Sequence, residues 1–220
     1  MSESVPARSL SRRRLLAVGA GVAGGAALWT SGLDSVAHAA SRPAAESEPG
    51  TWTGGRSANG WPVIDDRARI RASPTAGHVI EGSNASVTVL AGDAAVVLLH
   101  VARRFHYEVE ELEDGDVVGH STSRTIAAPY ESNYLSGTAI AVRPGEYPAG
   151  VGEALFPGQL VTVRDILADC EGVVRWGGKE KTPKAGHFQI DVAPGSEHLR
   201  EVADKIRQWN RSPGRGAGTD

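Results

Sequence analysis

The sequence predicts a single α+β domain, and three observations support this fold class. Segments with helical periodicity and short β-rich runs are mixed along the chain without a regular alternation, which favours α+β over a βαβ architecture. Hydrophobic residues make up 40% of the 220 residues and charged residues 22%, so the chain can bury a core. The 27 glycines and 12 prolines indicate many turns. We expect one compact domain with a small, mostly antiparallel sheet packed against helices.

Three segments show apolar residues at helical spacing. We predict helices over 94–106, 158–170 and 196–210, because apolar side chains recur there at intervals of three and four residues. Asp93 is the predicted N-cap of the first helix, and Ser196 begins the third. The apolar faces of these helices are expected to cover the apolar face of the sheet.

Four runs rich in β-branched and aromatic residues are predicted strands: 87–90, 138–142, 173–177 and 187–192. Gly177-Gly178 follows the third run and is typical of a turn rather than a phosphate-binding loop, because the spacing of a P-loop is absent.

Residues 1–39 have the pattern of an export signal. Arg12 and Arg13 precede an apolar stretch over 15–29, and Ala37-His38-Ala39 follows as a small-x-small cleavage site. The stretch of about 15 residues is shorter than the ~20 that a membrane span requires, which favours cleavage over a retained anchor. The paired arginines are typical of the twin-arginine route, so we expect a secreted bacterial protein with no membrane attachment after cleavage.

The remaining chain divides by composition into three parts. Residues 40–60 are rich in Ala, Pro, Ser, Gly and Glu and are predicted to form a flexible leader. Residues 61–211 form the predicted domain, and residues 212–220 a disordered tail.

Charge and cysteine content exclude several functional classes. The net charge of −3 argues against a nucleic-acid partner, because phosphate binding needs a basic surface. The only cysteine, Cys170, rules out an intramolecular disulfide, and its place on the apolar stripe of a helix favours an inert buried thiol over a nucleophile. The acidic run over 108–116 lacks the calcium-loop pattern and is interpreted as a solvated face.

Two stretches resemble a known enzyme family. They are S-N-Y-L-S-G-T-A-I-A (132–141) and V-V-R-W-G-G…H-F-Q-I-D (173–191). Together they resemble the zinc D-alanyl-D-alanine carboxypeptidases and L-alanyl-D-glutamate endopeptidases, which trim bacterial cell-wall peptides. The resemblance covers roughly residues 94–210. The positions that match the family motifs are Ser132, Gly137, Ala139, His187 and Phe188.

The same resemblance implies that the metal site is degenerate. Tyr134 stands where the family has its first zinc-ligand histidine, and Ala141 where it has the ligand aspartate. Lys184 and Ala185 occupy the two places of the catalytic glutamate, so His187 is the only retained ligand. A catalytic zinc needs three protein ligands, and alanine donates no lone pair. We therefore expect no metal, no other cofactor and no catalytic residue.

We interpret Ser132, Tyr134, Ala141, Trp176, Lys184 and His187 as a vestigial cleft. Ser132 is expected to orient its loop, and an aromatic groove with Arg175 and Lys184 to bind a peptide that ends in a carboxylate. Packing of Trp176 in the core is the alternative.

Three functions remain open. The first is a pseudoenzyme of the cell envelope that binds a peptidoglycan stem peptide or an envelope protein. The second is an active zinc peptidase of peptidoglycan with a rearranged metal site. The third is a secreted structural domain without a ligand, because a shared fold does not guarantee a shared function.

Overall fold

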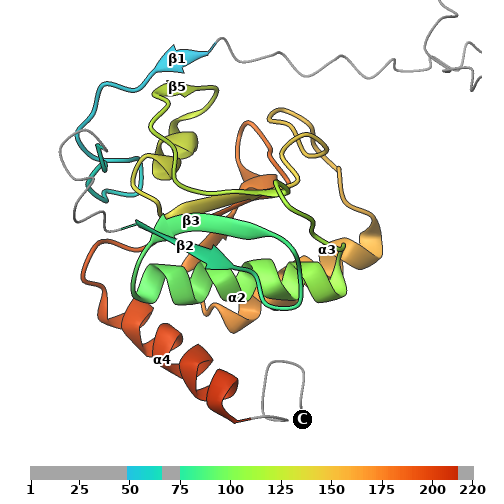
Figure 1. The fold of residues 1–220 in the computed structure, drawn as a ribbon. Helices are drawn as coiled ribbons and strands as arrows, with labels where there is room; N and C mark the ends of the chain where they lie inside the picture. Colours follow the sequence, from blue (N-terminus) through green and yellow to red (C-terminus); the bar gives the residue numbers. More distant parts are fainter. Residues whose placement is uncertain (1–48, 66–74, 213–220) are drawn as a thin grey trace, which may run out of the picture. The chain divides into compact units, whose positions relative to one another are not determined.

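A four-stranded antiparallel sheet positions the residues of interest. Its strands are β4 (Val117–Val118), β6 (Ala139–Val142), β7 (Val174–Trp176) and β8 (His187–Ile190), in the order β4-β6-β8-β7 (Figure 1). The computed structural model describes residues 49–65 and 75–212. The predicted signal (1–39), the first part of the leader (40–48) and nearly all of the tail (213–220) lie outside the described residues. Within them, the predicted α+β class with one compact domain is confirmed.

Both faces of this sheet are covered, and they differ in polarity. Side chains alternate along β8, so Phe188 and Ile190 lie on one face and His187 and Gln189 on the other. The apolar face packs against helix α2 (Asp93–Glu108), where the rings of Phe105 and Phe188 meet edge to face at 6.3 Å between centroids. The face with His187 is therefore the place to look for chemistry.

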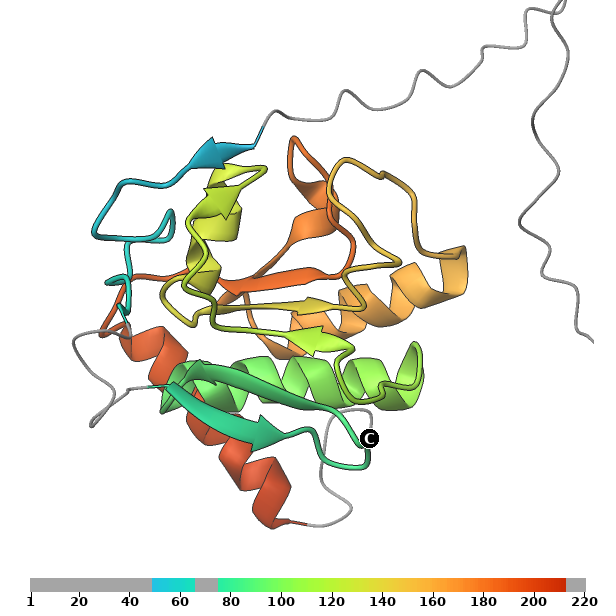
Figure 2. The same ribbon diagram turned by 45° about the horizontal axis from the view of Figure 1, so that its top comes forward.

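The three predicted helices are confirmed as α2, α3 (Pro157–Asp169) and α4 (Glu197–Arg211), and α2 packs against the other two (Figure 2). Ser196, the predicted start of the third helix, is the N-cap of α4, and its side chain accepts a hydrogen bond from the Leu199 amide. The prediction for Asp93 is wrong. Gly92 is the N-cap of α2, and the Asp93 carboxylate instead accepts a hydrogen bond from Arg207 of α4 at 2.7 Å.

A buried polar network joins the three helices. Arg104 of α2 is 7% exposed and bonds to Asp165 and Asp169 of α3. His100 of α2 lies 3.1 Å from the Asp169 carboxylate, and its ring packs on Trp209 of α4 at 5.8 Å between centroids. Burial lowers the pKa of His100 to about 4, although the hydrogen bond to the Asp169 carboxylate acts in the opposite direction.

The described part of the predicted leader belongs to the domain, so that boundary is wrong. Strand β1 (Gly50–Thr51) pairs with β5 (Thr125–Ile126), and Ser57 is buried. The Asn59 side chain donates to Thr138 Oγ1 and to the Ile190 carbonyl, both at 2.8 Å. Composition could not reveal this because the segment is polar and is held by hydrogen bonds rather than by apolar burial.

Four further elements complete the described fold. Strand β2 (Thr75–Val79) forms a hairpin with β3 (Ser86–Leu90), and two 3₁₀-helices are present, η1 (Pro129–Tyr134) and η2 (Gly177–Lys179). No helix in the described part of the chain is long and apolar enough to cross a membrane. Cys170 ends α3 in the core, and burial raises the pKa of its thiol to about 12, as expected for an inert cysteine.

Candidate functional site

The candidate site lies where η1 covers the polar face of β8. His187 is fully buried there and packs against two tyrosines of η1, with its ring centroid 4.6 Å from that of Tyr130 and 5.2 Å from that of Tyr134. Glu131 and Lys184 complete the group. We call these five residues, Tyr130, Glu131, Tyr134, Lys184 and His187, the His187 cluster.

Both ring nitrogens of His187 are hydrogen-bonded to protein atoms. Its Nε2 lies 2.9 Å from Gln189 Oε1, and its Nδ1 lies 2.6 Å from the Tyr134 hydroxyl. An amide oxygen can only accept, so Nε2 carries the proton and Nδ1 accepts from Tyr134. Burial lowers the pKa of His187 to about 4, and the imidazole is neutral at pH 7. Asn133 donates to the same Gln189 oxygen at 2.8 Å, which fixes its orientation.

A largely buried ion pair lies beside this imidazole. Lys184 Nζ is 2.6 Å from Glu131 Oε1 and 5.3 Å from the centre of the Tyr134 ring. Burial would raise the pKa of Glu131, but the hydrogen bond and charge of Lys184, together with the Ala127 amide, hold it below its usual value. Burial raises the pKa of the Tyr134 phenol well above 10, so the phenol is neutral.

This ion pair predicts an asymmetric response to mutation. Glu131→Leu alone leaves the Lys184 ammonium 12% exposed and unpaired, and we expect a loss of about 3 kcal/mol of unfolding free energy. The double variant Glu131→Leu/Lys184→Met removes both charges and is expected to recover most of that loss. Urea unfolding at neutral pH measures both values. A double variant no more stable than the single one would show that the pair contributes in another way.

The structure brings together most of the predicted cleft. Ala141 of β6 is the direct cross-strand partner of His187. The two residues that match zinc-ligand positions of the resembled family are therefore adjacent. Tyr134 and Lys184 both contact this point. Ser132 is fully buried, donates to the Pro129 carbonyl at 2.7 Å and accepts from the Ala58 amide at 2.8 Å, which fixes the η1 loop.

Trp176 does not belong to this cluster, and its assignment to the cleft is corrected. It pairs with Phe188 across β7 and β8, so its indole lies on the apolar face and joins the core. The alternative interpretation of Trp176 as a core residue is the one that holds. Its Nε1 donates to the Ala185 carbonyl at 2.6 Å.

The residues at this point do not fit the zinc ion that the resemblance implies. The lone pair of His187 Nδ1 already accepts the Tyr134 proton, the Tyr134 phenol is a poor ligand when neutral, and Ala141 offers no donor. The Lys184 ammonium would add a positive charge beside the metal. Nowhere in residues 49–65 and 75–212 do three or more His, Cys, Asp or Glu side chains form a metal-binding group.

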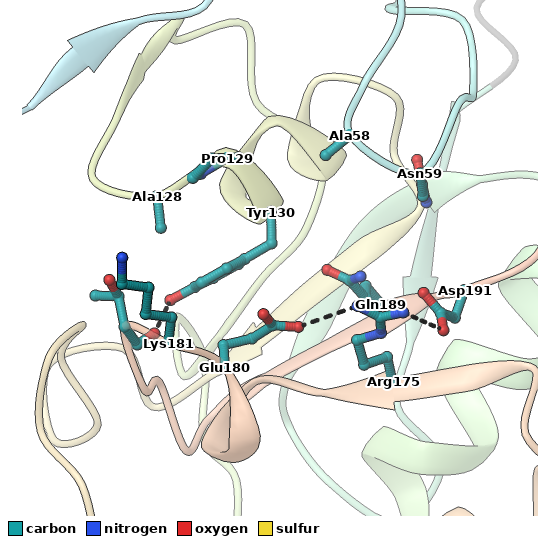
Figure 3. A pocket seen from close by; sticks show the side chains of 11 residues that line it. Ala58, Asn59, Ala128, Pro129, Tyr130, Arg175, Glu180, Lys181, Gln189 and Asp191 are labelled. Atoms are coloured by element: carbon teal, nitrogen blue, oxygen red, sulfur yellow. Dashed lines mark hydrogen bonds and ion pairs between the residues drawn. The ribbon is translucent and has the colours of Figure 1, made fainter.

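A pocket of about 400 Å³ opens beside the cluster (Figure 3). Tyr130 forms one wall, and Arg175 and Gln189, which are cross-strand partners, lie on the strands below. Asp191 and Glu180 flank the Arg175 guanidinium at 2.8 and 3.6 Å. The other lining residues are Ala58, Asn59, Ala128, Pro129, Lys181 and Thr182. His187 is not among them, because Tyr130 covers it.

Sequence reasoning missed Tyr130, Asn133 and Gln189. Gln189 had a usable signal, since it follows His187 by two residues in a predicted strand and so lies on the same face. Tyr130 and Asn133 had none, because η1 is a short irregular turn without periodicity. The predicted groove is found in part: Arg175 lines the pocket, but Tyr130 provides its aromatic wall, and Lys184 points into the cluster.

Comparisons of the chain with protein-family models, with curated proteins and with solved structures find no match.

Proposed function

We propose that this is an exported protein of the bacterial cell envelope that binds a cell-wall stem peptide without cleaving it. The observation that carries the proposal is the engagement of both His187 nitrogens by Tyr134 and Gln189. In the resembled family that histidine holds the metal, whereas here a tyrosine occupies its lone pair. The cluster therefore has the chemistry of a packed support beneath a pocket rather than that of a hydrolytic centre.

The adjacent pocket supplies groups that suit a peptide with a free carboxylate. Arg175 is half exposed, and its guanidinium is a charge-assisted donor to a carboxylate. The Gln189 oxygen is already used twice, and among the described residues its NH₂ group has no partner. The Tyr130 ring offers an apolar wall. An Arg fork beside an amide donor and an aromatic wall favours the carboxyl end of a short peptide.

Calorimetry with a synthetic stem peptide tests this proposal. The probe is L-Ala-γ-D-Glu-L-Lys-D-Ala-D-Ala, compared with the same peptide carrying a C-terminal amide. We expect Arg175→Gln to weaken binding of the free acid by about tenfold or more, because a charge-assisted bond contributes about 1.5–3 kcal/mol. The amide is expected to bind the wild-type protein and the variant equally weakly.

A second surface arginine provides the matched control. Arg200 of α4 is 58% exposed and pairs with Glu197, much as Arg175 pairs with Asp191, but it lies outside the pocket. Arg200→Gln is expected to bind the free acid like the wild type. Equal binding of acid and amide by the wild type would contradict the proposed carboxylate recognition.

Two further outcomes correspond to the other functions. Release of D-alanine from the probe, with about one bound zinc per chain, would support an active peptidase with rearranged ligands. Absence of both binding and cleavage would leave a structural domain, or an envelope protein as the partner instead of peptidoglycan. Export by the twin-arginine route is part of the proposal and rests on residues 1–39.

A further inference from the structure

Exposed apolar side chains lie at and just before the beginning of α3, next to the segment that carries Lys184 of the His187 cluster. Phe156 and Val161 are 77% and 63% exposed, and Val151 of the preceding loop is 44% exposed. These are three of the six large apolar side chains that are exposed in the described part of the chain. We call the region formed by Val151, Phe156 and Val161 the α3 surface. The three lie close together in sequence, and contiguous exposed apolar residues mark an interaction site more often than scattered ones do.

A pocket of about 220 Å³ adjoins the α3 surface: Val151 lines it, whereas Phe156 and Val161 lie outside its lining. Leu155 and Leu160 form its sides, and Trp176 and Ala185 are among its other lining residues. Gly178 keeps the indole in place, because a Cβ at this position would lie 2.2 Å from a ring carbon of Trp176. Phe156, an exposed ring, directly follows the lining residue Leu155 in the chain and so stands at the edge of this apolar hollow.

Charges of both signs border the same pocket. Arg164, Lys179 and Glu153 line it, and none of them forms an ion pair within residues 49–65 and 75–212. A partner that carries charges of one sign only would pair either with the two basic residues or with Glu153, but not with both. A second copy supplies both signs: if a two-fold axis places Glu153 of one protomer against Arg164 of the other, the reverse contact follows by symmetry.

We propose that two copies of this chain associate through the α3 surface, with Phe156 of each seated in the pocket of the other. The observations that carry this inference are the ring and hollow on one surface and the unpaired charges of opposite sign around the hollow. The α3 surface and its pocket share no residue with the pocket lined by Tyr130 and Arg175, so association and peptide binding can be measured separately.

Sedimentation of the full chain tests the dimer over a wide concentration range, up to about 1 mM, the level at which even weak association becomes visible. We expect concentration-dependent dimerisation, and Phe156→Ala should raise the dissociation constant about tenfold or more, as for a central aromatic residue. Val161→Ala is expected to weaken it less, and Val79→Ala, which truncates a 73% exposed valine of β2, should leave it unchanged. A monomer at every concentration would overturn the inference.

Charge exchange tests the two-fold arrangement itself. Arg164→Glu and Glu153→Arg each place like charges on both sides of a self-contact, so each variant alone is expected to be monomeric. An equimolar mixture restores opposite charges at both contacts and is expected to dimerise like the wild type. Circular dichroism of each variant verifies its folding. A mixture that stays monomeric while both variants are folded would contradict the proposed pairing.

Discussion

His187→Ala is expected to lower the free energy of unfolding by about 4 kcal/mol, within the range for loss of a large buried side chain with its hydrogen bonds. The imidazole is fully buried and packs against two tyrosine rings, and β8, which carries it, is held between β6 and β7, so its removal leaves a cavity that cannot easily close. It also leaves the Tyr134 hydroxyl without its acceptor and the Gln189 oxygen without one of its two donors. Urea unfolding monitored by fluorescence measures the loss.

Two comparisons separate packing from catalysis in this variant. His198→Ala removes a half-exposed imidazole on α4 and is expected to change stability by no more than about 0.5 kcal/mol. Tyr134→Phe keeps the ring but removes the donor to Nδ1, and should cost about 1–3 kcal/mol. If His187→Ala keeps wild-type stability but abolishes a measurable hydrolysis of the stem peptide, the imidazole is catalytic and the proposed function is wrong.

The helices and the central strands could be predicted because each buries one regular face. On α4, Leu199, Val202 and Ile206 recur at helical spacing and are all buried. Every residue of β6 and β8 is buried, because both faces of these strands are covered, and their sequences therefore do not alternate between apolar and charged residues. The helix boundaries fall within about two residues of those predicted, the usual uncertainty for frayed ends.

The candidate site could be predicted only in part. Ala141 and His187 lie together because the spacing within both motifs places them on paired strands. Trp176 was misplaced because proximity in sequence to the second motif says nothing about which face of β7 a side chain occupies. Side chains alternate between the two faces along a strand, but which face a given residue occupies depends on the pairing register. Here the register pairs Trp176 with Phe188 of the apolar face.

The polar contacts around η1 had no sequence signal at all. Asn59 bonds across 131 residues to the Ile190 carbonyl, and Ser57 bonds across 79 residues to Ser136. Such pairs depend on the final fold, since serine and asparagine are equally suited to solvent and to turns. The same reasoning explains why the first residues of the domain were interpreted as a leader.

Acidification from about pH 7.5 to 4 is expected to remove several kcal/mol of stability, chiefly through His100 and His187. Each has a pKa of about 4 in the folded protein, against an ordinary value of 6.5. Between these values the unfolded chain binds a proton that the folded chain does not, so stability falls as the pH falls. The stability that the two neutral histidines contribute is fully present above about pH 6.5. Below that pH it decreases by about 1.4 kcal/mol per pH unit for each histidine.

Neighbouring charges modify this effect without reversing its sign. Around His100, Asp169 favours the charged form, whereas Arg103 and Arg104 oppose it. Around His187, Lys184 opposes protonation and Glu131 favours it. Glu131 also makes the protein less stable as the pH falls, because its pKa is lower in the folded protein than in the unfolded chain. The stability it contributes is present above its unfolded pKa and is lost as the pH falls through its folded pKa.

Denaturant unfolding at intervals of about half a pH unit measures this slope and assigns it to individual histidines. His100→Gln and His187→Gln should each reduce the slope between about pH 6.5 and 4.5 by up to half, because glutamine does not titrate. A wild-type slope near zero would mean that His187 takes up a proton in the folded protein as readily as in the unfolded chain. Nδ1 would then be a donor, and the hydrogen bond from Tyr134 that supports the proposed non-catalytic role could not form.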